Sequence, residues 1–320
     1  MMEIPLHIRI ADWRSRLDSW AGSSMFAITL LPLALVVVIF VALCLRTLPL
    51  MEQSSIPDLL FGRTWSPQRG LFGFYPFIAG TLWVTAGAVL LAIPPCLLTA
   101  IYLAEYAGKA IRLAVKPLLD ILAAIPSVVY GVWGMLAIVP WVQNNLIPFF
   151  SQKLGFLAIF QTENPTGFGI LAGALVLAVM IAPFIISVTY EVLVTVPEGT
   201  RQAGLALGAT RWQTIKSSIL PITLPGIAAG IVLGASRALG ETMAVLMVVG
   251  NVAKVPGSIF DPAYPLPALI ANNYGEMMSI PLYDSALMGA ALILLVIVLT
   301  FNIASTLILR RIMGRVRRAW

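Results

Sequence analysis

Six apolar stretches, each long enough to cross a bilayer as a helix, constrain this 320-residue chain more than any other feature. A helix needs about 20 residues to cross the hydrocarbon core. Hydrophobic residues make up 59% of the chain and charged residues only 11%, so a soluble enzyme, a disordered chain and a disulfide scaffold are excluded. We expect an all-α, polytopic membrane protein with six transmembrane helices, at Ser24–Leu45, Pro76–Leu103, Pro117–Val142, Gly167–Tyr190, Ile222–Val249 and Ser285–Leu309.

The positions of lysine and arginine predict the orientation of the chain. Fourteen of the 20 lie in the N-terminus, residues 104–116, residues 191–221 and the C-terminus, whereas five lie in the alternate segments. Cytoplasmic loops carry an excess of these residues. We therefore expect both termini to lie in the cytoplasm, which agrees with six spans. The net charge of +6 follows from this bias, so we expect contact with membrane lipid and no nucleic-acid partner.

The first twenty residues predict a short helix that lies in the cytoplasmic interface of the membrane. Ile10, Trp13, Leu17 and Trp20 are spaced as one helical face, and arginines lie among them. A frayed tail is the alternative. We divide the chain into a cytoplasmic N-terminal interfacial segment (1–23), the first transmembrane helix with an external loop (24–75), a core of five transmembrane helices with a cytoplasmic loop at 191–221 (76–309), and a basic cytoplasmic tail (310–320).

Two outer loops, at residues 143–166 and 250–284, are long. Each serves either as a structural lid or as a docking surface for an external partner, and the sequence leaves both alternatives open.

Residue types exclude most catalytic chemistry within the membrane. The two cysteines, Cys44 and Cys96, lie in apolar runs, and the single histidine, His7, lies outside every span. A Ser/His or Cys/His catalytic pair and a His/Cys metal cluster therefore cannot be built there. Gly108-Lys109 lacks the remaining residues of a phosphate-binding loop. We expect no catalytic residue, no metal and no directly bound cofactor, so any ATP that is used must bind another chain.

The segment 197–221 is too polar to span the membrane and carries helix signals. Pro197 suits the start of a helix, and Gly208 can adopt a left-handed conformation that ends it. Thr210 and Gln213 form a capping box for a second helix. The sequence predicts two short helices that meet at Gly208 and protrude into the cytoplasm.

The second of these helices is expected to present an apolar face. Trp212 and Ile215 form this face, and Arg211 and Lys216 flank it.

Two opposite charges, Arg237 and Glu241, lie inside the fifth predicted span. Their i, i+4 spacing places them on one face of a continuous helix, where they can pair. A charge in a span costs free energy and by default indicates a functional site; a structural ion pair is the alternative. Arginine suits an oxyanion because its planar fork donates two parallel hydrogen bonds. Small residues around the pair allow close helix packing or leave room for a solute: Gly230, Gly234, Ala235, Ser236, Ala238 and Gly240.

Weaker candidates for the same pathway are hydroxyl residues nearby in the sequence or on other spans. Each more readily forms a hydrogen bond between helices than a contact with a solute. They are Thr242, Thr85, Ser127 and Tyr130.

The 197–221 segment resembles the EAA loop of ABC importer permeases, whose pattern is E-A-A-x3-G-x9-I-x-L-P. Gln202 replaces the usual glutamate, Gly204 replaces an alanine, and Ser218 replaces the isoleucine. In the family this loop docks in a groove of the ATPase subunit, so the resemblance implies that residues 198–216 do so here. The residues it assigns to coupling are Gln202, Ala203, Gly204, Gly208, Ala209, Thr210, Arg211, Trp212, Leu220 and Pro221.

A second resemblance, over about residues 70–310, is to the C-type permease subunit of phosphate-specific ABC importers. It is carried by Arg237-Ala-Leu-Gly-Glu-Thr242 with Met243, by Ile125-Pro-Ser-Val-Val-Tyr-Gly131 and by Ala206-Leu-Gly-Ala-Thr-Arg211. It implies a type I ABC importer permease fold in the bacterial cytoplasmic (inner) membrane and import of inorganic phosphate by alternating access. Implied partners are an A-type permease subunit, two ATPase subunits that use ATP, and a periplasmic or extracellular phosphate-binding protein.

Other functions remain as alternatives. A permease for another oxyanion or small solute would share these motifs. A gradient-driven secondary transporter is disfavoured because no inverted repeat is evident and because the 191–221 loop predicts an ATPase partner.

A paired Arg237 raises a physical difficulty, since it offers phosphate no net positive charge. Phosphate carries about one to two negative charges near neutral pH. Either phosphate displaces Glu241 from Arg237, so that the pair acts as a gate, or Glu241 accepts a hydrogen bond from a protonated phosphate oxygen, which would favour phosphate over sulfate. We prefer the first, because a transport pathway needs a weak site.

Overall fold

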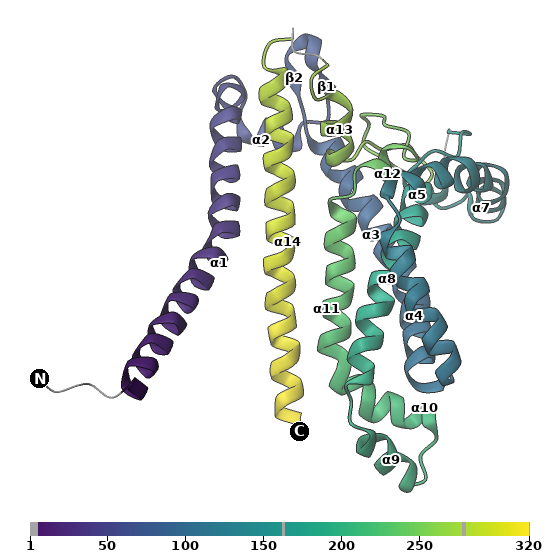
Figure 1. The fold of residues 1–320 in the computed structure, drawn as a ribbon. Helices are drawn as coiled ribbons and strands as arrows, with labels where there is room; N and C mark the ends of the chain where they lie inside the picture. Colours follow the sequence, from purple (N-terminus) through teal and green to yellow (C-terminus); the bar gives the residue numbers. More distant parts are fainter. Residues whose placement is uncertain (1–5, 162–163, 277–279, 320) are drawn as a thin grey trace, which may run out of the picture.

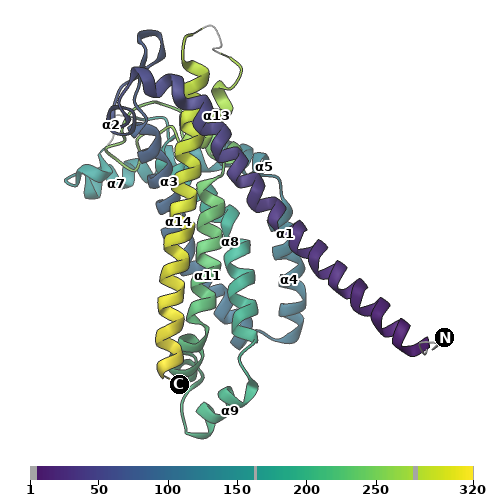
Figure 2. The same ribbon diagram turned by 90° about the vertical axis from the view of Figure 1, so that its left-hand side faces the viewer.

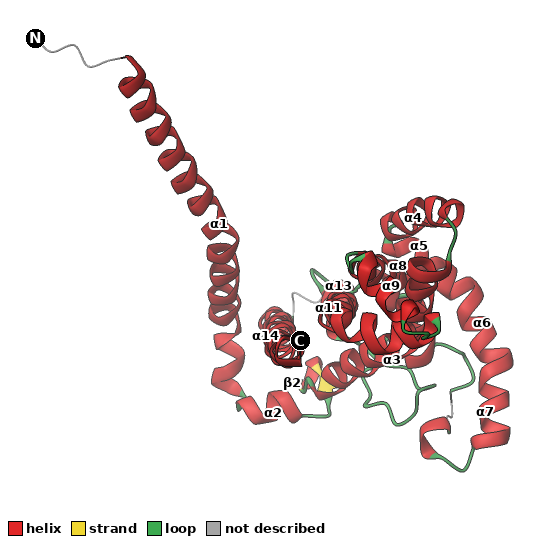
Figure 3. Cartoon of the chain, turned by 90° about the horizontal axis from the view of Figure 1, so that it is seen from below, coloured by secondary structure: helices red, strands yellow, loops and turns green. Residues whose placement is uncertain are grey.

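The computed structural model describes residues 6–161, 164–276 and 280–319, and these are almost wholly helical (Figures 1 and 3). Five helices are long and apolar enough to cross a membrane, and a sixth span results if one sharply bent pair counts as one. The predicted all-α architecture is confirmed. The elements, in chain order, are α1 (Leu6–Gln53), α2 (Ile56–Phe61), β1 (Trp65–Ser66), η1 (Pro67–Arg69), β2 (Leu71–Phe72), α3 (Tyr75–Ile101), η2 (Tyr102–Tyr106), α4 (Lys109–Ala124), α5 (Ser127–Trp133), η3 (Gly134–Ile138), α6 (Val139–Trp141), η4 (Val142–Leu146), α7 (Ile147–Leu154), η5 (Ala158–Phe160), α8 (Ile170–Val194), α9 (Glu198–Ala206), α10 (Arg211–Thr214), η6 (Ile215–Ile219), α11 (Leu220–Leu239), α12 (Met243–Leu246), α13 (Leu266–Asn273) and α14 (Tyr283–Ala319).

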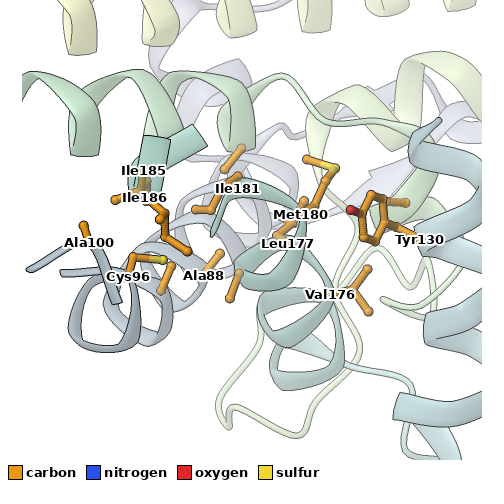
Figure 4. Packing of buried hydrophobic residues seen from close by; sticks show 14 of the residues in the cluster. Ala88, Cys96, Ala100, Tyr130, Val176, Leu177, Met180, Ile181, Ile185 and Ile186 are labelled. Carbon is orange, nitrogen blue, oxygen red and sulfur yellow. The ribbon is translucent and has the colours of Figure 1, made fainter. Parts of the chain in front are cut away.

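Helices α3, α8 and α11 form the centre of the bundle, and buried apolar side chains of α3 and α8 fill the space between them (Figures 1 and 4). A Cβ atom on Gly234 would lie 2.8 Å from Ile185 Cγ1, and one on Gly230 would lie 3.1 Å from Val188 Cγ1. Such small residues let helix backbones approach closely within a membrane. At these two glycines, therefore, the small residues preceding Arg237 pack α11 against α8.

Helix α1 is one continuous helix of 48 residues rather than a short interfacial helix followed by a separate span. Only its last turns pack on the body, where Leu50 is buried near Gly289 of α14. Toward its start, α1 diverges from α14 and its described side chains are exposed (Figures 1 and 2). The expected apolar face includes Ile10, Trp13 and Leu17, whose side chains lie outside the described residues, so its place in the interface stays a prediction.

The third span, predicted as Pro117–Val142, is broken. Helix α4 ends at Ala124, Ile125 is extended (φ −60°, ψ 129°), and the following helices turn away by 91°. A proline disfavours the helical conformation in the residue before it, so Pro126 ends α4. The chain then continues through α5, α6 and α7, so much of the outer loop predicted at 143–166 is helical.

Strands β1 and β2 pair antiparallel and form a hairpin next to α2. Aromatic rings hold this end of the bundle together. The ring of Trp65 lies 4.9 Å from that of Phe77, with Phe72 and Phe74 at 5.4 and 5.6 Å, all measured between centroids. Helix α13 lies in the predicted outer loop 250–284 and covers the same end (Figure 1). Both predicted outer loops therefore contain helices, because their apolar residues have neighbours to pack against.

Replacing Gly234 by leucine tests the packing of α11 against α8. Overpacking of a close helix contact costs about 1–3 kcal/mol, so we expect a lower melting temperature of the purified protein in detergent. Gly314→Leu is the matched control, since nothing lies within 4 Å of a Cβ atom at Gly314. Equal melting temperatures for the two variants would contradict this packing.

Candidate functional site

The segment that follows α8 forms the predicted pair of short helices. Helix α9 begins after Pro197, and Gly208 adopts the left-handed conformation with φ 81°. The Thr210 hydroxyl accepts a hydrogen bond from Gln213 N at 3.2 Å, while Gln213 Oε1 accepts one from Thr210 N at 2.8 Å. The predicted glycine hinge and capping box are confirmed. We call residues 198–216 the coupling loop.

The exposed tip of the coupling loop differs from the predicted one. Trp212 is exposed as expected, but Ile215 is buried in the core, so the two do not form one apolar face. The exposed apolar side chains are instead Leu205, Leu207 and Trp212, with Leu207 88% exposed. Leu207 could not be predicted from helical periodicity, because its exposure depends on its position beside the glycine hinge.

The second helix of the coupling loop is continuous with the fifth span. Residues Arg211–Leu239 form one helical rod of 29 residues. Within it, only the hydrogen-bond pattern changes, to that of a π-helix in the turn η6. At 1.5 Å per residue this rod is about 43 Å long. A Cβ atom on Gly204 would lie 2.6 Å from Thr214 Oγ1, so α9 lies directly against the start of the rod. Leu220 and Pro221, predicted as the end of the loop motif, lie within it.

Among the other predicted coupling residues, Gln202 and Ala203 lie exposed on α9, and Arg211 is exposed at the start of α10. The amide of Ala209 donates to Gly204 O at 3.2 Å and closes the turn between the helices. All ten predicted coupling residues thus belong to the two short helices, the turn or the start of α11.

A partly buried ion pair connects the coupling loop to the end of α3, and sequence reasoning missed it. Arg201 Nη2 lies 2.9 Å from Glu105 Oε1, and Nε donates to both carboxylate oxygens at 3.1 and 3.2 Å. The side chains are only 16% and 9% exposed. The hydrogen bonds that Arg201 donates to the Glu105 carboxylate raise the pKa of Arg201 above its ordinary value, so the guanidinium stays charged. The available signal was a lone acidic residue at the start of the basic segment 104–116.

The fifth predicted span, Ile222–Val249, is interrupted where the charged residues lie. Helix α11 ends at Leu239, and α12 does not begin until Met243. Arg237 and Glu241 therefore do not share a helical face, and no ion pair joins them in the part of the chain that the structure describes. The prediction of a pair was wrong because it assumed that the helix continues through Gly240.

Each of the two charges has another neighbour. The Arg237 guanidinium lies over the ring of Phe184 on α8, with Cζ 4.0 Å from the ring centroid. A cation in this position is attracted by the ring, although the ring carries no charge that could neutralise it. Glu241 Oε1 accepts a hydrogen bond from Ala244 N at 3.2 Å at the start of α12. Arg237 is exposed on the surface of this chain, so it is available to an anion.

The break at Pro126 and the break at Gly240 meet in space. Helix α5 lies against α12 (Figure 1), and a Cβ atom on Gly131 would lie 3.1 Å from Ala244 Cα. The Tyr130 hydroxyl donates to Leu122 O at 2.8 Å, a carbonyl in the last turn of α4 that also accepts from Ile125 N at 3.3 Å. Tyr130 is also close enough to Arg237 for the two to interact electrostatically.

The weaker candidates are not gathered around Arg237 by any hydrogen bond of the described residues. Thr242 donates only to Gly240 O, at 3.4 Å, and Thr85 is buried on α3. Ser127 is half-buried in the first turn of α5.

Asn302 of α14 is a further residue that sequence reasoning missed. The Ser236 hydroxyl donates to Asn302 Oδ1 at 3.0 Å and ties α11 to α14 one residue before Arg237. An asparagine inside an apolar span was the available signal, since such residues mark interhelical hydrogen bonds.

The sequence matches a family model described as "Binding-protein-dependent transport system inner membrane component" over residues 96–318. A protein of Haemophilus influenzae named "Phosphate transport system permease protein PstC" is 36% identical over 296 residues, which cover 90% of this chain and 93% of that protein. A protein of Methanocaldococcus jannaschii named "Probable phosphate transport system permease protein PstC" is 32% identical, with 89% and 93% covered.

Two solved structures share the fold. A chain of a bacterial ABC transporter involved in the import of the acidic polysaccharide alginate is 18% identical, with a TM-score of 0.56, 93% of this chain covered and 98% of that chain. A chain of the MetNI methionine ABC transporter in inward-facing conformations is 22% identical, with a TM-score of 0.50, 75% of this chain covered and 94% of that chain. The fold is that of type I ABC importer permeases.

Replacing Gly208 by valine tests the glycine hinge. A β-branched residue at φ 81° is strained, and the left-handed conformation costs about 1–2 kcal/mol. We expect the coupling loop to be cut faster by a protease in limited digestion of the detergent-solubilised protein. Gly199→Val is the control, because Gly199 lies in helical α9 with nothing within 4 Å of its Cβ position. Indistinguishable digestion of the two variants would refute the role of the hinge.

Proposed function

Because the chain belongs to the family of binding-protein-dependent transport system inner membrane components, we propose that it is the permease subunit of an ATP-driven importer of inorganic phosphate. Relatives named as phosphate transport system permease proteins match most of the chain. One observation of the site carries the proposal: Arg237 is exposed at the meeting point of two interrupted helices, and no carboxylate of the described chain pairs with it.

Arg237 is proposed to contact the phosphate in transit. Its guanidinium rests on Phe184, and an anion can draw it away by offering two oxygens to its planar fork. A cation–π contact is worth about 0.5–2 kcal/mol, so leaving the ring costs little compared with a charge-assisted hydrogen bond. The bound state stays weak enough for release, which transport requires.

Glu241 is proposed to select the protonation state of the anion. Oε1 is engaged by Ala244 N, whereas Oε2 has no hydrogen-bond partner in the described chain. A carboxylate only accepts hydrogen bonds when ionised, so it can contact a protonated phosphate oxygen and repels a fully ionised anion. This replaces displacement of Glu241 from Arg237, because the structure shows no ion pair between them.

The coupling loop is proposed to bind an ATPase subunit, because it protrudes from one end of the bundle (Figure 1) and exposes apolar side chains there. The rod that begins at Arg211 carries Arg237 near its other end. A displacement of the loop therefore moves the site, which is the element that alternating access needs.

Partners and cellular position complete the proposal. Family membership supports ATPase and binding-protein partners in general. We propose two ATPase subunits that bind the ATP, an A-type permease subunit against the face that exposes Arg237, and an external phosphate-binding protein. The protein is a multi-pass inner-membrane permease. The start of α1, the end of α14 and the coupling loop lie at one end of the bundle (Figure 1), which supports cytoplasmic termini together with the basic residues there.

The domain division is kept as part of the proposal. Residues 76–309 form the permease core, 1–23 an interfacial segment, 24–75 the first span with its external loop, and 310–320 a basic tail.

A permease for another oxyanion is the second candidate. It is favoured by the same exposed arginine, since a guanidinium also fits sulfate and carboxylates. Competition of phosphate uptake by sulfate and molybdate separates the two candidates.

Neutralising each charge tests the site. Arg237→Gln should lower phosphate uptake by reconstituted vesicles about 10- to 100-fold, since a hydrogen bond to a charged group contributes about 1.5–3 kcal/mol. Glu241→Gln should weaken the preference for phosphate over sulfate. Lys254→Gln, an exposed outer-loop cation, is the control. Undiminished and selective uptake by both site variants, with the ATPase intact, would exclude this pathway.

Replacing Leu207 by aspartate tests the docking of the ATPase at the coupling loop. Burying a carboxylate in an apolar contact is costly, so we expect the co-purified ATPase subunit to be lost at a detergent concentration that preserves the wild-type complex. Leu71→Asp, at an exposed leucine of the hairpin at the opposite end, is the control. Equal yields of ATPase with both variants would disprove docking at this tip.

A further inference from the structure

The ion pair between Arg201 and Glu105 has a structural role that extends beyond its two residues. Arg201 Nη2 donates to Leu193 O at 2.9 Å, and Nη1 donates to Val196 O at 2.6 Å. One guanidinium on α9 thus holds the end of α3, through Glu105 in η2, and the carbonyls at and just beyond the end of α8. It connects the α8–α9 segment to a segment 96 residues away in the sequence.

Neighbouring charges at the same end lack this bridging geometry. Arg112 donates to Ala104 O and Ala107 O, at 2.7 and 3.0 Å, and so caps only the segment directly before its own helix. Lys116 and Glu191 lie 3.8 Å apart but are 60% and 62% exposed. An exposed pair of this kind contributes little to stability. Only Arg201 links the coupling loop to α3 by ion pairing in the described chain.

A cavity beside the ion pair lies between α9 and the end of α3. It has a volume of about 280 Å³, and its lining includes Glu105, Arg201, Leu205 and Thr214. Continuous apolar packing therefore does not join α9 to the end of α3 at this place. The contact between them depends on the directional hydrogen bonds of Arg201.

We propose that Arg201 and Glu105 form a joint that transmits motion of α9 to α3. They are positioning residues, since neither touches the transported anion. The inference rests on the proposed function, because it assumes that an ATPase moves the coupling loop. Motion of the loop would then move two central helices at the same time. It would move α11 because the backbone is continuous, and α3 because the joint connects them. Bidentate hydrogen bonds suit this role because they fix orientation as well as distance.

The ratio of phosphate transported to ATP hydrolysed by the reconstituted complex tests the joint. Glu105→Gln and Arg201→Gln should each lower this ratio about fivefold or more, the usual scale of coupling between distant sites, while ATP hydrolysis continues. The double variant should be no worse than either single variant, because both remove the same link. Lys116→Gln is the matched control and should keep the wild-type ratio.

If the single variants assemble poorly, a covalent bridge between residues 105 and 201 can take the place of the ion pair. Glu105→Cys and Arg201→Cys are combined in a chain whose Cys44 and Cys96 are replaced by alanine, and the two thiols are bridged by a short bis-maleimide. We expect the unbridged protein to hydrolyse ATP with little transport, and bridging to restore the ratio. A merely stabilising pair would lower both activities together, and the bridge would not change their ratio.

Two results would overturn the joint. The first is a ratio of transported phosphate to hydrolysed ATP that equals the wild-type ratio in the Glu105 and Arg201 variants. The second is a bridged protein that hydrolyses ATP without transport while the wild-type complex couples the two. Failure of the proposed function gives a different result, since the wild-type complex itself would then show no phosphate uptake driven by ATP.

Discussion

The need to satisfy every backbone hydrogen bond within a membrane governs this structure. A continuous helix meets that need by itself, so each interruption requires a hydrogen bond from outside the regular helical pattern. At the Pro126 break, the Tyr130 hydroxyl donates to Leu122 O. At the Gly240 break, the Glu241 carboxylate accepts from Ala244 N. Because α5 also packs directly on α12, the segments that follow the two interruptions support each other.

The same interruption explains how an arginine in this part of the chain stays available to an anion. If α11 continued through Gly240, Glu241 would lie one turn beyond Arg237 and could neutralise it. The helix ends first, and the guanidinium rests on the Phe184 ring, which attracts it without cancelling its charge. A resting position of this kind suits the transport role that we propose, in which the arginine binds an anion weakly and releases it.

Much of the fold could be predicted from the sequence, because the dominant signals are local. Apolar runs of the length of a bilayer predicted the spans, and the glycine hinge at Gly208 with the capping box of Thr210 and Gln213 lies where the pattern placed it. Local chemistry also identified Arg237 and Glu241 as the unusual residues of the fifth span. Their pairing could not be predicted correctly, since helical spacing assumes an uninterrupted helix.

The sequence by itself thus determined the membrane class, the approximate spans, the coupling loop and the residues of interest. Only the tertiary structure decided which residues meet. It placed Phe184 of α8 under Arg237, brought Arg201 to Glu105 across 96 residues of sequence, and buried Ile215. These outcomes depend on contacts between helices that are distant along the chain, and periodicity within one helix carries no information about its neighbour. Local signals therefore predict the elements of this protein, whereas packing between elements creates its site.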